Sequence, residues 1–341
     1  MILSYRKIVI SKFGAPEVLK LIEEEHLPEP KRGEVRIKIL VTSASFTDTL
    51  LRKGLYPEIR KKVPFSPGYD LVGIVDKCGD EASKFIAGKR VTALTIIGAY
   101  SEYICLNEVD LIEVPDGLDS SEVVSLILSY MTAYQMMHRI AKVQAGQSIL
   151  VHGAGGAVGT ALLQLSRLLD LKVFGTGSKS KKTLINSFGA IYIDYQSEDF
   201  VERVKSLAGE VDAVFDSIGG DYFQRSYKVL KPNGFLVAYG FQKAILGKGS
   251  ILEIISGFIK LKLLNLLPNK KTVLFYSITA VRKKHPEWFI EDMIILMNLL
   301  KDGKIKPVIY RKMPLTEAVE AHKMLDQSKV EGKIILIVNN E

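Results

Sequence analysis

The pattern of hydrophobic and polar positions changes near residue 120. Before it, short runs in which apolar and polar side chains alternate are separated by Gly and Pro. Alternation of this kind is typical of half-buried strands, so this part of the chain is predicted to form a mostly β domain. The runs are RKIVISKF, GEVRIKILVTSAS, DLVGIVDKCG and GKRVTALTII.

After residue 120, apolar strand-like runs alternate with helical patterns. Continuous apolar strands separated by helices indicate a parallel sheet covered on both faces. The predicted fold class is therefore α/β, with a doubly wound parallel sheet beside the β-rich part. The expected strands are 148–152, 172–176, 190–194, 211–217, 234–240 and 272–277, and the expected helices are about 157–169, 180–187, 199–208 and 221–230. The tail, with helices near 287–301 and 315–327, is expected to return to the first domain.

A glycine-rich turn follows the first strand of the α/β part, in the sequence SILVHGAGGAVG. Gly153, Gly156 and Gly159 stand where the strand must turn sharply and start a helix. A Cβ in such a turn obstructs the chain reversal or the approach of a pyrophosphate, which binds to the free N–H groups of the helix. This context, strand then turn then helix, predicts dinucleotide binding.

The end of the second strand discriminates between the two nicotinamide dinucleotides. An acid there binds the ribose 2′-hydroxyl of NADH, whereas a 2′-phosphate needs cations and hydroxyls. The chain has Gly177-Ser178-Lys179-Ser180-Lys181-Lys182 and no acid. Lysines that merely solvate a helix start would be disfavoured by the positive end of the helix. The predicted cofactor is NADPH.

Composition and charge narrow the remaining classes. The net charge of +8 admits nucleic acid or an anionic membrane, but the lysines are scattered and no nucleic-acid motif is present. The two cysteines exclude a disulfide framework, and the first residues lack the apolar core of a secretory signal. We expect a cytoplasmic protein whose partner is a small molecule.

With this fingerprint, the chain resembles the medium-chain dehydrogenase/reductase superfamily, and most closely its zinc-free quinone oxidoreductases of the zeta-crystallin type. The likeness runs along nearly the whole chain. Its landmarks include SFTDTLLRKGLYP, VPFSPGYDLVGIV, GAYSEYICL, SYMTAYQMM, FGAIYIDYQSEDF, VFDSIGGDYF and EGKIILIV.

The resemblance implies a GroES-like β-rich catalytic domain, 1–126 with 279–341, and a Rossmann NADPH-binding domain, 127–278, with the active-site cleft between them. It also implies residue roles. The pyrophosphate would bind Gly153, Gly156, Ala157, Val158 and Gly159, and the 2′-phosphate Ser178, Lys181 and Tyr195. The nicotinamide and its ribose would lie near Thr132, Ile218, Gly219, Gly240 and Phe241.

Zinc ligands are missing from the places where zinc-dependent relatives carry them. Ser45 and Tyr69 occupy those places, and the histidines show no ligand spacing. We expect no metal, and His152, at the end of the first Rossmann strand, is expected to be a hydrogen-bonded structural residue.

Without a Lewis acid, the hydride acceptor has to be electron-poor already. Quinones and α,β-unsaturated carbonyls meet this need, since the protein only has to align the reactants and donate hydrogen bonds to the developing oxyanion. The candidate catalytic donors are Tyr69, Tyr56 and Ser45. Two alternatives stay open, a reductase of 2-enoyl thioesters or long-chain enals, and a catalytically weak NADPH-binding structural or regulatory protein.

The apolar segment 251–267, ILEIISGFIKLKLLNLL, departs from the resemblance. We rank three roles for it: covering the active-site cleft, forming a dimer surface, and lying on a membrane. A homodimer or homotetramer is expected, with the edge of the strand at 272–277 as one surface that could pair with its copy.

Overall fold

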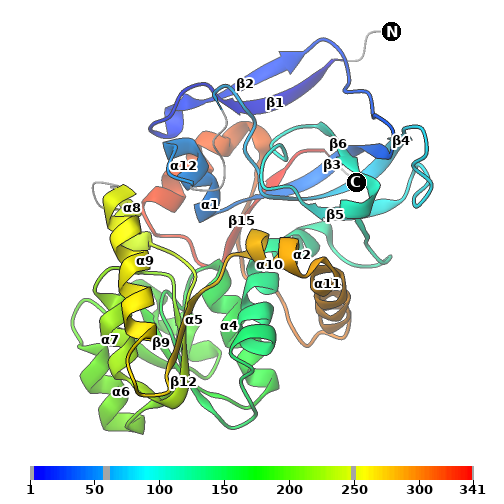
Figure 1. Ribbon diagram of the computed structural model, residues 1–341. Helices are drawn as coiled ribbons and strands as arrows, with labels where there is room; N and C mark the ends of the chain where they lie inside the picture. The colour runs from blue at the N-terminus through cyan, green and yellow to red at the C-terminus, as the bar shows by residue number, and fades with distance from the viewer. Residues whose placement is uncertain (1–3, 57–61, 247–250, 340–341) are drawn as a thin grey trace. The chain divides into compact units, whose positions relative to one another are not determined.

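The computed structural model describes residues 4–56, 62–246 and 251–339. The chain divides into two compact units, unit 1 (Met1–Leu128 and Ile309–Glu341) and unit 2 (Ser129–Val308) (Figure 1).

Unit 1 is built on a mostly antiparallel sheet of order β14-β15-β3-β4-β5-β7, with β6 also paired to β3 and a separate β1–β2 hairpin. In the first half of the central strand β3, buried and half-buried residues alternate, as the sequence predicts, whereas Ile39–Ala44 are all buried. Val35, Ile37 and Ile39 of this strand are fully buried in the core of the unit. The end of the predicted tail supplies β14 and β15 to this sheet, whereas its predicted helix near 287–301 lies in unit 2. The strands are β1 (Tyr5–Ile10), β2 (Leu19–Glu24), β3 (Glu34–Ala44), β4 (Asp70–Cys78), β5 (Arg90–Leu94), β6 (Tyr103–Asn107), β7 (Ile112–Glu113), β14 (Ile309–Pro314) and β15 (Lys333–Ile337), and the helices are α1 (Phe46–Lys53), α2 (Ser120–Ser125) and α12 (Ala318–Asp326).

Unit 2 contains a parallel sheet of order β10-β9-β8-β11-β12-β13. Counted from β8, this is the 3-2-1-4-5-6 order of the Rossmann fold. The strand order reverses between the first strand and the fourth, which is the switch point of the sheet. The predicted doubly wound α/β fold is confirmed, including the sixth strand, which forms one edge. The strands are β8 (Ser148–Val151), β9 (Lys172–Gly177), β10 (Ile191–Asp194), β11 (Val211–Asp216), β12 (Leu230–Ala238) and β13 (Thr272–Phe275).

Helices α4 to α7 fall on the predicted helical segments and pack against the strands of the sheet, and α11 falls on the predicted segment near 287–301 (Figure 1). The helices of unit 2 are α3 (Met131–Tyr134), α4 (Ala157–Leu168), α5 (Lys182–Ser187), α6 (Phe200–Ala208), α7 (Tyr222–Lys228), α8 (Gln242–Leu246), α9 (Ile251–Asn265), α10 (Ile278–Lys284) and α11 (Pro286–Lys301). None of the described helices is long and apolar enough to cross a membrane.

Residues 279–308 lie in unit 2, whereas the predicted boundary placed them with the β-rich domain. Buried polar contacts hold them there. Asp292 of α11 is fully buried and accepts hydrogen bonds from Gln135 (3.0 Å) and Arg139 (2.7 Å). Gln164 of α4 bonds both the carbonyl and the amide of Lys306. No sequence pattern indicates such long-range pairs.

Candidate cofactor-binding site

The glycine turn after β8 has the geometry that a phosphate site needs. Gly153 has a φ of +67°, in the left-handed region that favours glycine. A Cβ on Gly159 would lie 2.3 Å from the carbonyl oxygen of Gly153, so the first turn of α4 packs directly on the loop. Gly156 precedes α4 without a side-chain cap among the described residues, which leaves the N–H groups of Ala157 and Val158 at the open start of the helix.

The turn lies against the carboxyl ends of two neighbouring strands. The amide of Ala154 donates to the carbonyl oxygen of Thr176 in β9 (2.9 Å). A Cβ on Gly175 would come within 2.9 Å of the Ala154 Cβ, and one on Gly153 within 3.2 Å of the Ser217 Oγ after β11. The turn therefore occupies the switch point of the sheet, where open α/β folds bind their ligands.

Lys181 lies across this turn. Its side chain is buried, and its Cβ, Cγ and Cδ atoms would be 2.9–3.0 Å from a Cβ on Gly155. The stem of this lysine therefore covers the backbone of the glycine turn. Ser178 directly follows β9, and its hydroxyl contacts that of Ser180 (3.1 Å). Tyr195 follows β10 with an exposed side chain, and its amide bonds the carbonyl of Gly177 (3.4 Å).

The loops after β11 and β12, which are predicted to border the nicotinamide, pack on each other at the carboxyl ends of the strands. Asp216, the last residue of β11, accepts from the amides of Ile218 (2.8 Å) and Gly219 (3.1 Å). A Cβ on Gly240 would be 2.7 Å from the Ser217 carbonyl oxygen, and one on Gly219 would be 3.3 Å from the Phe241 Cα. The loops after β11 and β12 are thus brought together as the resemblance implied.

A buried chain of hydrogen bonds joins the glycine turn to the loop after β11. The Gly153 amide donates to the Thr176 hydroxyl (3.4 Å), which lies 3.0 Å from the His152 Nδ1. The His152 Nε2 lies 3.0 Å from the Ser226 hydroxyl, which donates to Asp216 (2.9 Å). Because Ser226 uses its proton on Asp216, it accepts from Nε2–H of His152, and Thr176 then donates to Nδ1.

His152 is consequently a structural residue, as expected from the sequence. Its ring is fully buried, and this burial lowers its pKa, which keeps the imidazole neutral. Its partners Thr176, Ser226 and Asp216 were not identified from the sequence. The one available signal is indirect: a histidine at the end of a buried strand needs two hydrogen-bond partners.

Thr132 is buried in α3, which packs against α4. Its described partner is the Tyr276 hydroxyl, which also donates to the Gln135 side chain (2.8 Å). Burial raises the pKa of Tyr276, and the hydrogen bond with Thr132 opposes this rise.

The candidate donors of unit 1 form two separate groups. The hydroxyls of Tyr56 and Tyr69 are 2.7 Å apart, with Tyr69 buried and Tyr56 half-buried. Ser45 instead caps α1: its hydroxyl donates to Asp48 (2.6 Å), and the Asp48 amide donates back to it (3.4 Å). The structure therefore brings the two phenols together and gives Ser45 a hydrogen bond inside its own turn.

Asp48 and Asp70 are two buried acids close in sequence to Ser45 and Tyr69. Asp48 also accepts from the amide of Gly68 (3.1 Å), and burial raises its pKa to about 6. Asp70 accepts from the amide (3.0 Å) and hydroxyl (2.6 Å) of Ser43 and lies 3.4 Å from the Lys333 ammonium. Burial raises the pKa of Asp70 as well, while Lys333 lowers it. Asp48 thus orders the turn at the start of α1.

The zinc-ligand-like places hold Ser45 and Tyr69, and neither offers the thiolate or imidazole of a tetrahedral zinc site. Within the described residues, no group of three or more His, Cys, Asp or Glu side chains is arranged to hold a metal ion.

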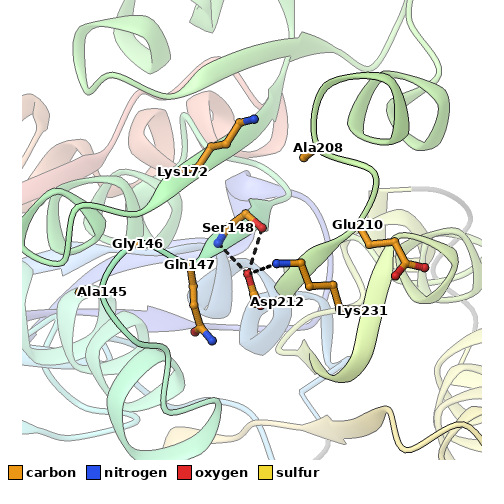
Figure 2. Close-up of a pocket in the computed structure, with 9 residues that line it drawn as sticks. All are labelled: Ala145, Gly146, Gln147, Ser148, Lys172, Ala208, Glu210, Asp212 and Lys231. Atoms are coloured by element: carbon orange, nitrogen blue, oxygen red, sulfur yellow. Dashed lines mark hydrogen bonds and ion pairs between the residues drawn. The ribbon is translucent and has the colours of Figure 1, made fainter.

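A hollow of about 400 Å³ lies at the amino ends of the strands of the Rossmann sheet, opposite the ends that carry the glycine turn (Figure 2). Asp212 accepts from the amide (2.8 Å) and hydroxyl (3.0 Å) of Ser148 and pairs with Lys231 (2.8 Å). Lys172 donates to the Leu207 carbonyl (2.9 Å). These polar groups bond each other, and the amino ends of the strands lie away from the switch point, so we assign no ligand here.

Comparison with known proteins agrees with this geometry. Residues 31–116 match the alcohol dehydrogenase GroES-like domain, and residues 188–336 match a domain described as zinc-binding dehydrogenase. A quinone oxidoreductase of Rattus norvegicus is 30% identical over 98% of this chain and 98% of its own length. A synaptic vesicle membrane protein VAT-1 homolog-like of Mus musculus is 31% identical over 98% of this chain and 81% of its length.

Among solved structures, an Escherichia coli quinone oxidoreductase complexed with NADPH superimposes with a TM-score of 0.85 and 28% identity, over 98% of this chain and all of the other. The order of the landmarks, the switch-point glycine turn and the relatives at 30% identity lead to one assignment. The chain is an oxidoreductase and belongs to the quinone oxidoreductase family of the medium-chain dehydrogenase/reductase superfamily.

Proposed function

We propose that this chain is an NADPH-dependent reductase that acts, without a metal, on quinones or on the activated C=C bonds of α,β-unsaturated carbonyls. The observation that carries the proposal is the buried Lys181 side chain across the glycine turn, beside a β9 end that holds no acid. The NADPH complex of the Escherichia coli relative supports the same cofactor.

The residues present fit this cofactor. A Cβ at Gly159 would collide with the backbone of Gly153 and Ala154, so glycine lets the turn fold closely onto α4, which begins with uncapped amides that can bind a pyrophosphate. Ser178, Lys181 and Tyr195 would surround the 2′-phosphate, where lysine and hydroxyls form charge-assisted hydrogen bonds. Gly153, Gly156, Ala157, Val158 and Gly159 would bind the pyrophosphate, and Thr132, Ile218, Gly240 and Phe241 the nicotinamide half. When bound, NADPH supplies the hydride.

The phenols of unit 1 are the proposed donors to the substrate oxygen. Two hydroxyls 2.7 Å apart form a short relay, in which one phenol donates to the oxyanion while it accepts from the other. Tyr69 occupies a zinc-ligand-like place, so this donor would take over the stabilisation of charge that a metal supplies in zinc-dependent relatives. Ser45 contributes through α1, because its hydroxyl is bonded to Asp48.

A substrate panel with the full chain tests the proposal. We expect steady oxidation of NADPH with 1,4-benzoquinone and with small enones, and much slower turnover with NADH. Rates that rise with acyl length on enals or enoyl thioesters would instead identify the lipid reductase alternative. Saturable NADPH binding without turnover on any acceptor would identify a binding protein, and absence of NADPH binding would overturn the cofactor assignment.

A further inference from the structure

Helix α9 has two opposite apolar faces, and only one of them is covered by unit 2. On the covered face, Ile254 and Leu261 are buried, and Gly257 packs so closely on Phe241 that a Cβ would lie 2.5 Å from its ring. This face lies against α7 and β13 (Figure 1). The helix is therefore closely packed on unit 2, so the exposure of its other face does not result from loose packing.

The opposite face carries a continuous row of exposed large apolar side chains. Leu252 is 76% exposed, Ile259 53% and Leu263 59%. Spacings of three and four residues place them on one stripe of the helix. The row on α9 is Leu252, Ile255, Ile259 and Leu263, and the exposed Leu266 follows directly after the helix. Monomeric proteins rarely expose a contiguous apolar surface of this kind unless it binds something.

Lysines border this stripe on both sides. At about 100° per residue, Lys260 and Lys262 project about 80° to either side of Leu252. Neither forms an ion pair with a residue that the structure describes. Between residues 251 and 271 the chain has four lysines and one acid, Glu253. The stripe thus has a cationic border, on a chain whose net charge is +8.

This charge pattern discriminates between two occupants. A second copy would meet the stripe through a two-fold axis, which sets the same patch against itself and brings like charges together. An anionic lipid surface accepts both features at once, because the apolar row enters the boundary between headgroups and acyl chains while the lysines contact the headgroups. With 15 residues, α9 is about 22 Å long and too short to span the hydrocarbon core.

We propose that the exposed stripe of α9 docks this protein on an anionic lipid surface, with the helix lying in the plane of the interface. The inference does not depend on the reductase activity, since it uses only the surface of α9.

The test is co-sedimentation of the full chain with vesicles of phosphatidylcholine alone and of phosphatidylcholine with phosphatidylserine. We expect binding to the anionic vesicles that weakens as salt is raised. Leu263→Glu, which places a charge in the stripe, should weaken binding at least tenfold. The double variant Lys260→Glu with Lys262→Glu should remove the preference for phosphatidylserine.

Ile294→Glu is the matched control, because Ile294 on α11 is 47% exposed and the substitution changes the net charge equally. It should bind as the unmodified chain does. Thermal unfolding of each variant checks that the fold is kept. The proposal is wrong if the unmodified chain ignores anionic vesicles, or if Leu263→Glu and Ile294→Glu behave alike. It is also wrong if Leu263→Glu only dissociates an oligomer, measured by light scattering, because a second copy then covers the stripe.

Discussion

The candidate binding groups of the two units are of different kinds. In unit 2 they are mostly backbone amides exposed by glycine, as at Gly153 and Gly159, where the missing side chain is the functional feature. In unit 1 they are side chains that already bond each other, as Ser45 bonds Asp48 and Tyr56 contacts Tyr69. The groups of unit 2 depend on the backbone shape of a glycine turn, whereas those of unit 1 depend on side-chain hydrogen bonds. The two should therefore respond differently to substitution.

The largest effect should come from adding a side chain to the glycine turn. In Gly159→Ala the new Cβ would meet the Gly153 carbonyl at 2.3 Å, and backbone cannot move aside as a flexible side chain can. We expect NADPH binding to weaken by more than roughly 100-fold, measured by fluorescence titration. Gly146→Ala is the control, since Gly146 has a positive φ (+76°) that strains an alanine, but its Cβ would meet nothing within 4 Å. Equal binding losses in both variants would contradict the steric argument.

The phenol pair should respond in turnover and not in cofactor binding. Tyr69→Phe removes one hydroxyl of the 2.7 Å pair and with it a donor to the developing oxyanion. We expect kcat for a quinone to fall roughly 100-fold while the Kd for NADPH stays unchanged. Tyr56→Phe should have the same direction. If both variants keep full kcat, the substrate oxygen is stabilised by other groups.

The cation at the glycine turn should decide between the two dinucleotides. Lys181→Glu replaces a charge-assisted hydrogen bond with repulsion of the 2′-phosphate, so kcat/KM for NADPH should fall roughly 10- to 100-fold while that for NADH hardly changes. Lys179→Glu is the matched control, because Lys179 is exposed beside the same helix start. A proportional loss with both cofactors would show that Lys181 supports the loop and does not contact the phosphate.

The sequence predicts those features of the fold and the site that depend on residues close together in the chain. The parallel sheet and the glycine turn follow from local patterns, since Gly153 to Gly159 carry their geometry within one short segment. The Ser45 cap is local, since Asp48 lies three positions along the chain, but the Thr176–His152–Ser226–Asp216 chain requires partners brought in by the fold. Likewise, Asp292 draws α11 into unit 2 through Gln135 and Arg139, which lie over 150 positions earlier in the chain.

The buried hydrogen-bond chain should show itself in the pH dependence of stability. Burial lowers the pKa of His152 below that of the unfolded chain, so the folded state binds fewer protons and the free energy of unfolding should fall as pH drops below about 6.5. His322, whose pKa burial lowers to about 3, adds the same trend. His152→Phe should flatten this dependence in part. It should also cost about 1–3 kcal/mol at pH 7.5, because Ser226 and Thr176 lose a partner.

Urea unfolding at pH 5.5 and 7.5 measures both effects. His138→Phe is the control, because burial lowers the pKa of His138 too, but its ring is only half-buried and stacks on Tyr134. An unchanged pH slope in His152→Phe would mean that the hydrogen-bond chain does not hold a neutral imidazole.

The smallest effect should come from Ser45, and its size separates capping from catalysis. If the Ser45 hydroxyl acted on the substrate, Ser45→Ala would lower kcat as strongly as Tyr69→Phe. In the structure that hydroxyl donates to Asp48 and closes a capping box at the start of α1, so its loss should cost about 1 kcal/mol of unfolding free energy and leave kcat within roughly twofold. Ser45→Thr keeps an oxygen at the cap and should recover most of this loss. A large fall in kcat in Ser45→Ala with unchanged stability would return Ser45 to the catalytic donors and remove the contrast between the two phenols and the cap.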